Sequence, residues 1–304
     1  MTNYDLIIIG AGPAGLTAGI YAARARINAL IIEKMAPGGQ VLITDWVENY
    51  PGFPEGISGF DLSEKMRVQA INLGLKFETA QVKNLNLSNK TKEVICQNKT
   101  FKTKSLIIAS GAFPKRLGIG EDNFIGKGLS FCATCDAPFY KNKTVVAVGG
   151  GDTAVQESIF LTKFAKKVYL VHRRDQLRAT KILQERAFTN EKIEFIWDNV
   201  VTGFEGVSKI QGVKIKNIKT NQTQTIKSDG CFIWVGILPN TSFLNDDINT
   251  DEFGFITTDE NMKTSVFGVF AAGDVRQTPL RQITTAIGDG ATATISAEHY
   301  IENL

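Results

Sequence analysis

The strongest constraint on the fold of this chain is a glycine-rich turn between an apolar run and a helical pattern. The turn follows the apolar residues 6–9 and reads Gly10-Ala11-Gly12-Pro13-Ala14-Gly15. A helical stretch over 16–26 and an apolar strand over 29–32 come next, and that strand runs into Glu33. This order of strand, turn, helix and strand predicts a βαβ unit.

Each residue of this pattern has a separate task in binding a dinucleotide. Gly10 makes the tight turn, Gly12 lets the backbone approach a pyrophosphate, and Gly15 permits close contact between helix and strand. The start of the helix offers free N–H groups and a partial positive charge to phosphates. Glu33 stands where a carboxylate accepts hydrogen bonds from a ribose hydroxyl. The first unit therefore predicts a dinucleotide site.

The same pattern occurs a second time further along the chain. We expect a strand over 144–148, a helix over 155–164 and a strand over 168–171. The turn between the first strand and the helix reads Gly149-Gly150-Gly151-Asp152-Thr153-Ala154. The offset from Gly10 to Gly149 equals the offset from Glu33 to His172, so the two copies align without a gap. The chain is therefore expected to have an α/β fold with two Rossmann-like nucleotide-binding domains, and to bind two cofactors.

The two copies differ at the position that contacts the ribose. Where the first ends on Glu33, the second continues as His172-Arg173-Arg174, with Arg178 shortly after. A carboxylate would repel a 2′-phosphate, whereas guanidinium groups offer it charge-assisted hydrogen bonds. The second site is therefore expected to prefer NADPH to NADH.

Length and charge narrow the class of protein. The chain has 304 residues, which suggests two domains, and its formal net charge of +3 is too small to indicate a nucleic-acid partner. The N-terminus lacks the basic region of a secretory signal, and the first apolar run ends at Gly10, far short of a membrane span. We expect a cytoplasmic protein.

Two of the four cysteines form the motif Cys132-Ala-Thr-Cys135-Asp136, shortly before the second glycine-rich turn. In a reducing compartment such a pair is expected to be catalytic or metal-binding rather than structural. A zinc site would need a second pair of ligands, which Cys96 and Cys231 do not supply, so we expect no metal. Both isolated cysteines are expected to be buried as small apolar residues.

Together these motifs resemble those of low-molecular-weight bacterial thioredoxin reductase, a flavoprotein family. Further matching blocks are Gly38-Gly39-Gln40, 47–52, 272–275 and Arg281-Gln282. The resemblance implies a homodimer with an FAD domain formed by 1–114 and 242–304 and an NADPH domain over 115–241. The breaks at 111–114 and 236–240 are rich in Gly and Pro, and we expect them to be the hinge.

The resemblance also implies a mechanism. Cys135 receives electrons from the flavin, Cys132 attacks the disulfide of thioredoxin after a domain rotation, and Asp136 acts as acid and base. Proposed FAD ligands are Gly10, Gly12, Pro13, Ala14, Gly15, Glu33, Gly39, Gln40, Asn49, Gly273, Asp274, Arg281, Gln282 and Ile283. Proposed NADPH ligands are Gly149, Gly151, Asp152, Thr153, Ala154, His172, Arg173, Arg174 and Arg178.

The chain departs from the family pattern at one place, and three alternative functions remain open. The family usually has Gly-Phe-Phe after the Cys motif, whereas this chain has Ala137-Pro138-Phe139, which is tolerable if Pro138 falls in the first turn of a helix. A flavin disulfide reductase of the peroxiredoxin-reducing type would carry an extra thioredoxin-like domain, and a ferredoxin-linked one would not need the arginine cluster. A zinc-holding binding module is a more remote alternative.

Overall fold

The computed structural model describes residues 3–44, 46–88, 90–131 and 133–304. The chain divides into two compact units, one formed by Met1–Phe113 with Leu238–Leu304 and the other by Pro114–Ile237. The units are described one at a time below.

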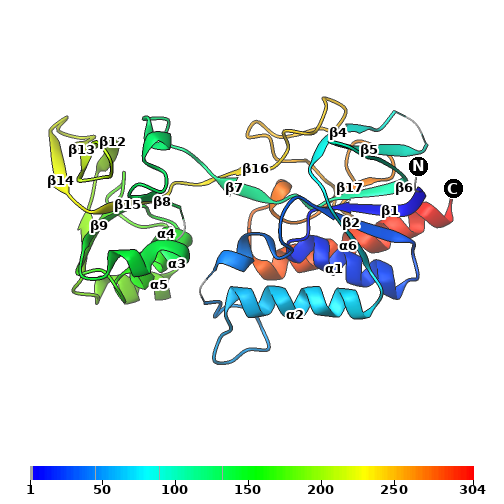
Figure 1. Cartoon of the computed structure of the whole chain (residues 1–304), viewed down its shortest axis with the longest axis horizontal. Helices are drawn as coiled ribbons and strands as arrows, with labels where there is room; N and C mark the ends of the chain where they lie inside the picture. Colours follow the sequence, from blue (N-terminus) through cyan, green and yellow to red (C-terminus); the bar gives the residue numbers. More distant parts are fainter. Residues whose placement is uncertain (1–2, 45, 89, 132) are drawn as a thin grey trace. The chain divides into compact units, whose positions relative to one another are not determined.

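The discontinuous unit contains a sheet of seven strands (Figure 1). Its strands are β1 (Asn3–Ile9), β2 (Ala29–Glu33), β3 (Lys76–Thr79), β4 (Val82–Asn86), β5 (Lys92–Cys96), β6 (Thr100–Ile108) and β17 (Val269–Ala271). The order is β3-β2-β1-β6-β5-β4, with β17 also paired to β6. The pairs among β3, β2, β1, β6 and β17 are parallel, whereas β4 and β5 join as antiparallel strands. The carboxyl ends of five parallel strands, β1, β2, β3, β6 and β17, therefore lie at one edge.

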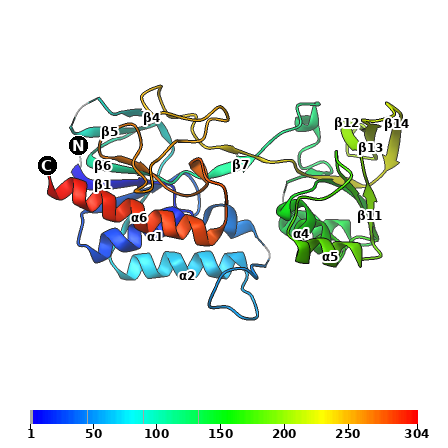
Figure 2. The same ribbon diagram turned by 180° about the vertical axis from the view of Figure 1, so that it is seen from behind.

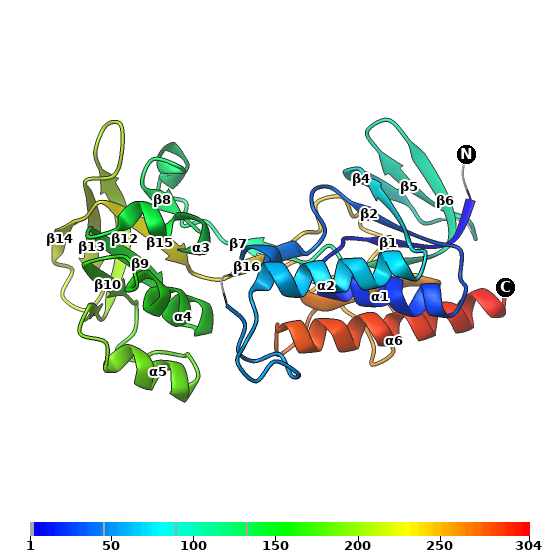
Figure 3. The same ribbon diagram turned by 60° about the horizontal axis from the view of Figure 1, so that its bottom comes forward.

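Helices cover one face of this sheet. They are α1 (Pro13–Arg24), η1 (Gly39–Ile43), α2 (Gly59–Asn72), η4 (Gly273–Val275) and α6 (Ile283–Glu302). Figure 3 shows α2, α1 and α6 side by side, and Figure 2 shows β4 and β5 on the side away from them. Successive side chains of β1 point to opposite faces of the sheet, which explains why the unit has a core on each face. Leu6 and Ile8 belong to the core under the helices, and Ile7 and Ile9 belong to the core on the other face.

The second unit repeats this plan around a five-stranded parallel sheet of order β11-β10-β9-β15-β8. These strands are β8 (Leu129–Ser130), β9 (Thr144–Gly149), β10 (Lys167–Val171), β11 (Ile193–Ile196) and β15 (Gly230–Trp234). A smaller antiparallel sheet is formed by β12 (Asn199–Glu205), β13 (Gly212–Asn217) and β14 (Thr223–Lys227). The helices are η2 (Glu121–Phe124), α3 (Ala133–Asp136), η3 (Ala137–Tyr140), α4 (Asp152–Leu161) and α5 (Lys181–Phe188). Figure 1 shows α4 and α5 on the face of the parallel sheet opposite to β12–β14.

The predicted α/β fold with two Rossmann-like domains is confirmed. The expected strands and helices of both βαβ units are present, but each helix begins three residues earlier than expected, at Pro13 and at Asp152. The reason is that Gly12 and Gly151 already occupy the N-cap position with extended backbone, so the helix starts inside the glycine-rich turn.

Two short strands connect the units, β7 (Ala112–Pro114) and β16 (Ile237–Pro239), and they pair with each other. The backbone N–H of Lys115 also donates to the carbonyl of Gly236 at 2.9 Å. The compact units change at 113/114 and 237/238, whereas the sequence placed the boundaries at 114/115 and 241/242. The described part of the chain contains no helix long and apolar enough to cross a membrane.

Candidate nucleotide and redox sites

The first glycine-rich turn links the carboxyl end of β1 to α1. Gly10 has a φ of +101°, a conformation that strongly favours glycine. A Cβ on Gly15 would lie 1.9 Å from the carbonyl oxygen of Gly10, so the helix can approach the strand only because no side chain is present. The roles expected of Gly10 and Gly15 thus have a direct steric basis in the structure.

The carboxylate of Glu33 lies across this turn from the end of β2. Its Oε2 accepts a hydrogen bond from the backbone N–H of Ala11 at 2.8 Å, and its Oε1 accepts one from that of Met35 at 3.0 Å. Each oxygen keeps a second lone pair. The side chain is therefore held in one orientation and can still accept hydrogen bonds from a ligand.

The loop after β2 packs against the same turn. The N–H of Gly38 donates to the carbonyl of Ala11 at 2.7 Å, and a Cβ on Gly39 would lie 3.0 Å from the Cα of Gly12. Gly39 has a φ of +60°. The neighbouring Gln40 donates from Nε2 to the carbonyl of Ala112 at 3.3 Å, which ties this loop to the start of β7. Two backbone segments thus approach closely beside the helix start.

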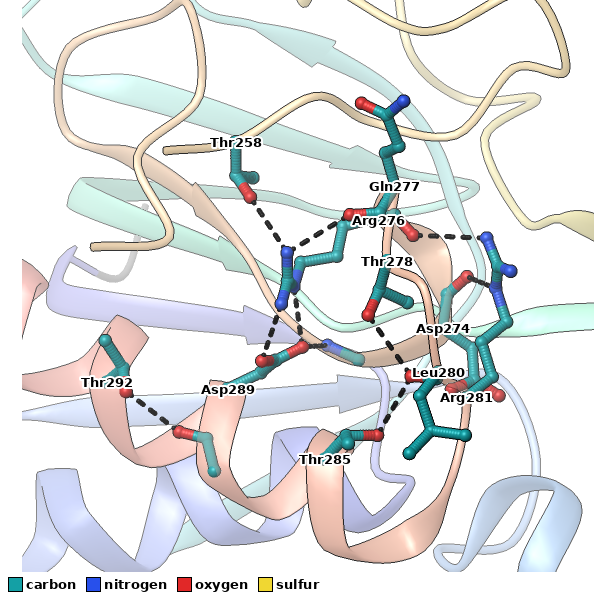
Figure 4. A network of polar contacts seen from close by, with 12 residues as sticks. Thr258, Asp274, Arg276, Gln277, Thr278, Leu280, Arg281, Thr285, Asp289 and Thr292 are labelled. Carbon is teal, nitrogen blue, oxygen red and sulfur yellow. Dashed lines mark hydrogen bonds and ion pairs between the residues drawn. The ribbon is translucent and has the colours of Figure 1, made fainter. Parts of the chain in front are cut away.

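A buried charge pair supports the segment after β17, as Figure 4 shows. The guanidinium of Arg276 donates to both oxygens of Asp289, at 2.6 and 2.9 Å, and the N–H of Gly273 donates to Asp289 Oδ2 at 3.0 Å. A Cβ on Gly273 would lie 2.9 Å from the Cβ of Ala14. The pair therefore anchors the backbone of Gly273 against the start of α1.

Asp274 follows directly in this segment and is half-buried. Burial raises the pKa of its carboxyl group, the charge of Arg281 opposes this, and the charge of Asp289 adds to it. Arg281 Nε donates to the backbone carbonyl of Asp274 at 3.4 Å (Figure 4). Its guanidinium also lies over the ring of Phe255, 4.0 Å from the centroid. Asp274 and Arg281 are thus brought together as neighbours.

The start of α6 reaches a residue far away in the sequence. Gln282 is the N-cap residue and Ile283 the first residue of the helix. Asn49 Nδ2 donates to Gln282 Oε1 at 2.9 Å, although 233 residues separate the two. The start of α6 and the loop containing Asn49 therefore meet.

These residues fit the adenine dinucleotide part of FAD. A helix start with free N–H groups, an oriented acceptor at Glu33 and glycines that leave room for a ligand converge at the carboxyl ends of β1 and β2. The Oγ of Ser63, in α2, is buried with no hydrogen-bond partner among the described residues. A Cβ on Gly38 would lie 3.0 Å from this Oγ, so a polar group without a partner among the described residues lies beside the loop that follows β2.

The second glycine-rich turn is built in the same way in the other unit. Gly149 has a φ of +149°, and a Cβ on Gly151 would have no heavy atom within 4 Å. Thr153 and Ala154 lie in the first turn of α4, and Ala154 stands where the first unit has Gly15. Asp152 Oδ1 accepts a hydrogen bond from the N–H of Thr180 at 2.6 Å.

Three exposed arginines lie on the segment that follows β10 and reaches this turn. The N–H of Arg178 donates to the carbonyl of Gly150 at 2.7 Å, which holds the arginine-bearing loop against the glycines. Arg173, Arg174 and Arg178 are exposed, and within the described residues none of them forms an ion pair. Guanidinium groups without a carboxylate partner are available to an anionic ligand, so this unit fits a 2′-phosphorylated nucleotide.

His172 lies beneath the turn rather than on the surface. Its side chain is buried, and a Cβ on Gly150 would lie 2.3 Å from the imidazole ring. Burial, followed by the charges of Arg178, Arg174 and Arg173, lowers the pKa of His172. The Nε2 atom has no hydrogen-bond partner among the described residues. The structure thus brings His172 to the predicted site, as a neutral support for Gly150.

The Cys motif is only partly within the described structure. Cys132 lies outside the described residues, and Cys135 belongs to α3, but its side chain is likewise outside the described part. Asp136 is half-buried and occupies the N-cap position of η3 without a side-chain capping hydrogen bond. Burial, with a contribution from Asp136, raises the pKa of Tyr140 to about 12. The geometry of the two thiols therefore stays a prediction.

Two further expectations, about Pro138 and about the two isolated cysteines, are confirmed. Pro138 lies in the first turn of η3, where its missing N–H costs no hydrogen bond. Cys96 and Cys231 are free and buried, and burial raises the pKa of both thiols. Among the described residues, no group of three or more His, Cys, Asp or Glu side chains is arranged to hold a metal ion.

Sequence reasoning missed two contributors, the Arg276–Asp289 pair and Ser63. Neither of them belongs to a motif, because each acts through a contact with a distant segment. A local signal exists for Asp289, which is an acidic residue flanked by two glycines in α6.

Known proteins match this chain over nearly its whole length. The pattern of the pyridine nucleotide-disulphide oxidoreductase family matches residues 4–290. Thioredoxin reductase from Listeria innocua is 48% identical over 304 residues, covering 99% of this chain and 95% of that protein. Thioredoxin reductase from Bacillus subtilis is 46% identical over 303 residues, covering 99% and 96%.

A crystal structure of Lactococcus lactis thioredoxin reductase in the FR conformation superimposes with a TM-score of 0.97 at 45% identity, covering 99% of this chain and 100% of that one. The similarity to thioredoxin reductases expected from the motifs is confirmed. The chain therefore belongs to the pyridine nucleotide-disulphide oxidoreductase family.

Proposed function

We propose that this chain is a thioredoxin-disulfide reductase, a flavoprotein that uses NADPH to reduce the disulfide of thioredoxin through Cys132 and Cys135. One observation carries the proposal. Two nucleotide turns of the same design lie in separate compact units, one beside the oriented carboxylate of Glu33 and the other beside arginines that form no ion pair among the described residues. The Cys motif belongs to the arginine-bearing unit.

The discontinuous unit is the proposed FAD domain. The N–H groups at the start of α1 would bind the pyrophosphate and Glu33 would bind the ribose. The start of α6, with Gln282 and Ile283, would lie against the flavin, where the partial positive charge of the helix favours the negative charge of the reduced state.

The other unit is the proposed NADPH domain. The start of α4 would bind the pyrophosphate, and Arg173, Arg174 and Arg178 would bind the 2′-phosphate. When bound, the two cofactors supply hydride-transfer chemistry, which delivers two electrons to a disulfide.

The chemistry at the Cys pair follows from thiol–disulfide exchange. Two electrons and two protons convert the Cys132–Cys135 disulfide into a dithiol. The Cys132 thiolate attacks one sulfur of the thioredoxin disulfide, which forms a mixed disulfide and releases a thioredoxin thiolate. The Cys135 thiolate then attacks the sulfur of Cys132 in the mixed disulfide and displaces the second thioredoxin thiolate, so that the Cys132–Cys135 disulfide reforms and reduced thioredoxin leaves. Asp136 would transfer a proton to and from the thiols.

The paired strands β7 and β16 are the proposed hinge. Each is three residues long, so the two compact units are joined by two short segments. Rotation about them would let the nicotinamide and the Cys pair take turns at the flavin. We further propose that the enzyme acts as a homodimer in the cytoplasm, where its free thiols Cys96 and Cys231 stay reduced.

The test separates flavin reduction from disulfide turnover. In C135S, anaerobic NADPH should still bleach the flavin, while NADPH-dependent reduction of thioredoxin should be lost. C96A is the matched control, because it removes a buried thiol away from the motif and should keep full turnover. Thioredoxin reduction by C135S would contradict the proposed route, and a purified protein that cannot bind FAD would contradict the flavin assignment.

The second candidate is a flavin disulfide reductase with another electron donor or acceptor. The unpaired arginines favour NADPH as donor, and an assay that compares NADPH with reduced ferredoxin decides between the two. A panel of oxidised thioredoxins and peroxiredoxins decides the acceptor.

A further inference from the structure

Phe131, the residue before Cys132, is held at two points by residues from different segments. The indole Nε1 of Trp234 donates a hydrogen bond to the backbone carbonyl of Phe131 at 3.1 Å. The guanidinium of Arg116 lies over the Phe131 ring, 3.9 Å from its centroid. One contact fixes the backbone and the other fixes the side chain.

Both holding residues lie next to the strands that connect the two units. Arg116 follows β7 by two residues, and Trp234 is the last residue of β15, shortly before β16. The hydrogen bond from Lys115 N–H to the Gly236 carbonyl joins the two segments between them. One side chain on Phe131 therefore comes from the segment where the chain enters the Cys-bearing unit, and the other from the segment where it leaves.

Trp234 is also tied to the second nucleotide turn. It pairs with Gly149 in the sheet register, and a Cβ on Gly149 would lie 2.3 Å from the Trp234 carbonyl oxygen. The indole stacks on Phe232, with 5.7 Å between ring centroids and 20° between ring planes. The ring is therefore oriented by the sheet, and its N–H group is aimed at Phe131.

The carbonyl that Trp234 holds belongs to the peptide bond between Phe131 and Cys132. A peptide group is planar, so a hydrogen bond to its oxygen restricts rotation of the whole group. Disulfide exchange requires the attacking sulfur to be aligned with the disulfide that it attacks. A restriction on the peptide before Cys132 therefore acts on the step that needs alignment.

We propose that Trp234 and Arg116 are positioning residues for the disulfide-exchange step, acting on Cys132 through Phe131. This inference rests on the proposed function of the Cys pair. It assigns no contact with thioredoxin or a cofactor to either residue, and it ties the reactive motif to the segments where the hinge is expected.

The experiment uses the FAD-containing enzyme with NADPH and thioredoxin. W234F keeps an aromatic ring against Phe232 and removes the N–H donor. Loss of one such hydrogen bond should lower kcat for thioredoxin about three- to tenfold. KM for NADPH and the rate of flavin reduction in a single anaerobic turnover should stay unchanged, because neither requires an aligned Cys132. A purely structural role would instead raise KM for NADPH and slow flavin reduction as well, because Trp234 packs against Gly149 of the second nucleotide turn.

Two controls make the result specific. W197F is the same substitution in the same unit, at a ring that stacks on Phe195, and it should keep the wild-type kcat for thioredoxin. R116Q should lower kcat, and R116K, which restores a cation over Phe131, should recover much of it. Equal kcat for W234F and W197F, or for R116Q and R116K, would overturn the inference. A wild-type enzyme that fails to reduce thioredoxin would instead reject the proposed function.

Discussion

The pair formed by Arg276 and Asp289 is expected to be a main support of the proposed FAD domain. The two side chains are only 16% and 10% exposed, and two charge-assisted hydrogen bonds of 2.6 and 2.9 Å join them. D289N keeps the size of the side chain but leaves the guanidinium without a counter-charge and weakens the acceptor for Gly273 N–H. Breaking one side of a pair buried to this degree costs about 3 kcal/mol of unfolding free energy.

The assay is urea unfolding at a fixed FAD concentration, followed by the rise in flavin fluorescence on release. D5N is the matched control, because it removes the charge from an exposed pair with Lys104 in the same unit and should cost at most about 1 kcal/mol. Adding Arg276→Met to D289N should restore part of the stability, because no unpaired charge remains. If D289N costs no more than D5N, the pair does not anchor Gly273 and the reasoning is wrong.

Three further predictions follow from the two nucleotide turns. R173A combined with R178A should lower the ratio of kcat/KM for NADPH to that for NADH, and an unchanged ratio would exclude these arginines as 2′-phosphate ligands. Because the pKa of His172 is lowered in the folded state, the unfolded chain takes up a proton first as pH falls below about 6.5. The urea concentration at the unfolding midpoint should therefore decrease when the pH is lowered from 7.5 to 5.5. H172Q should show a smaller decrease, and an equal decrease would reject His172 as the cause. G15A should lower flavin bound per protein, since its Cβ would meet a backbone oxygen at 1.9 Å, whereas G288A, with open space around it, should bind flavin normally.

The local elements were predictable because their causes are local. Apolar alternation produces the strands, and a glycine that must adopt positive φ marks the turn, so both βαβ units could be recognised from short windows of sequence. The start of each helix was placed three residues late, because apolar periodicity begins after the turn while the helical backbone begins at Pro13 and Asp152. The burial of Cys96 and Cys231 was predicted from their apolar neighbours.

Contacts between distant segments could not be predicted in this way. Nothing near Asn49 in the sequence indicates that it meets Gln282, and nothing near Phe131 indicates that Trp234 donates to its carbonyl. His172 was expected at the ligand surface because of its place at the end of a strand, but packing of the sheet against the turn determines that the ring is buried under Gly150.

The sequence by itself determined the two nucleotide turns, the difference in charge between Glu33 and the arginine cluster, and the presence of a Cys pair in the second unit. These are properties of residue type and spacing, and they are sufficient to predict the fold class and the proposed chemistry. Only the tertiary structure decided that Asp289 anchors Gly273 and that Trp234 holds Phe131. The physical reason is that sheet register and helix packing, rather than spacing along the chain, determine which distant side chains come within hydrogen-bonding distance.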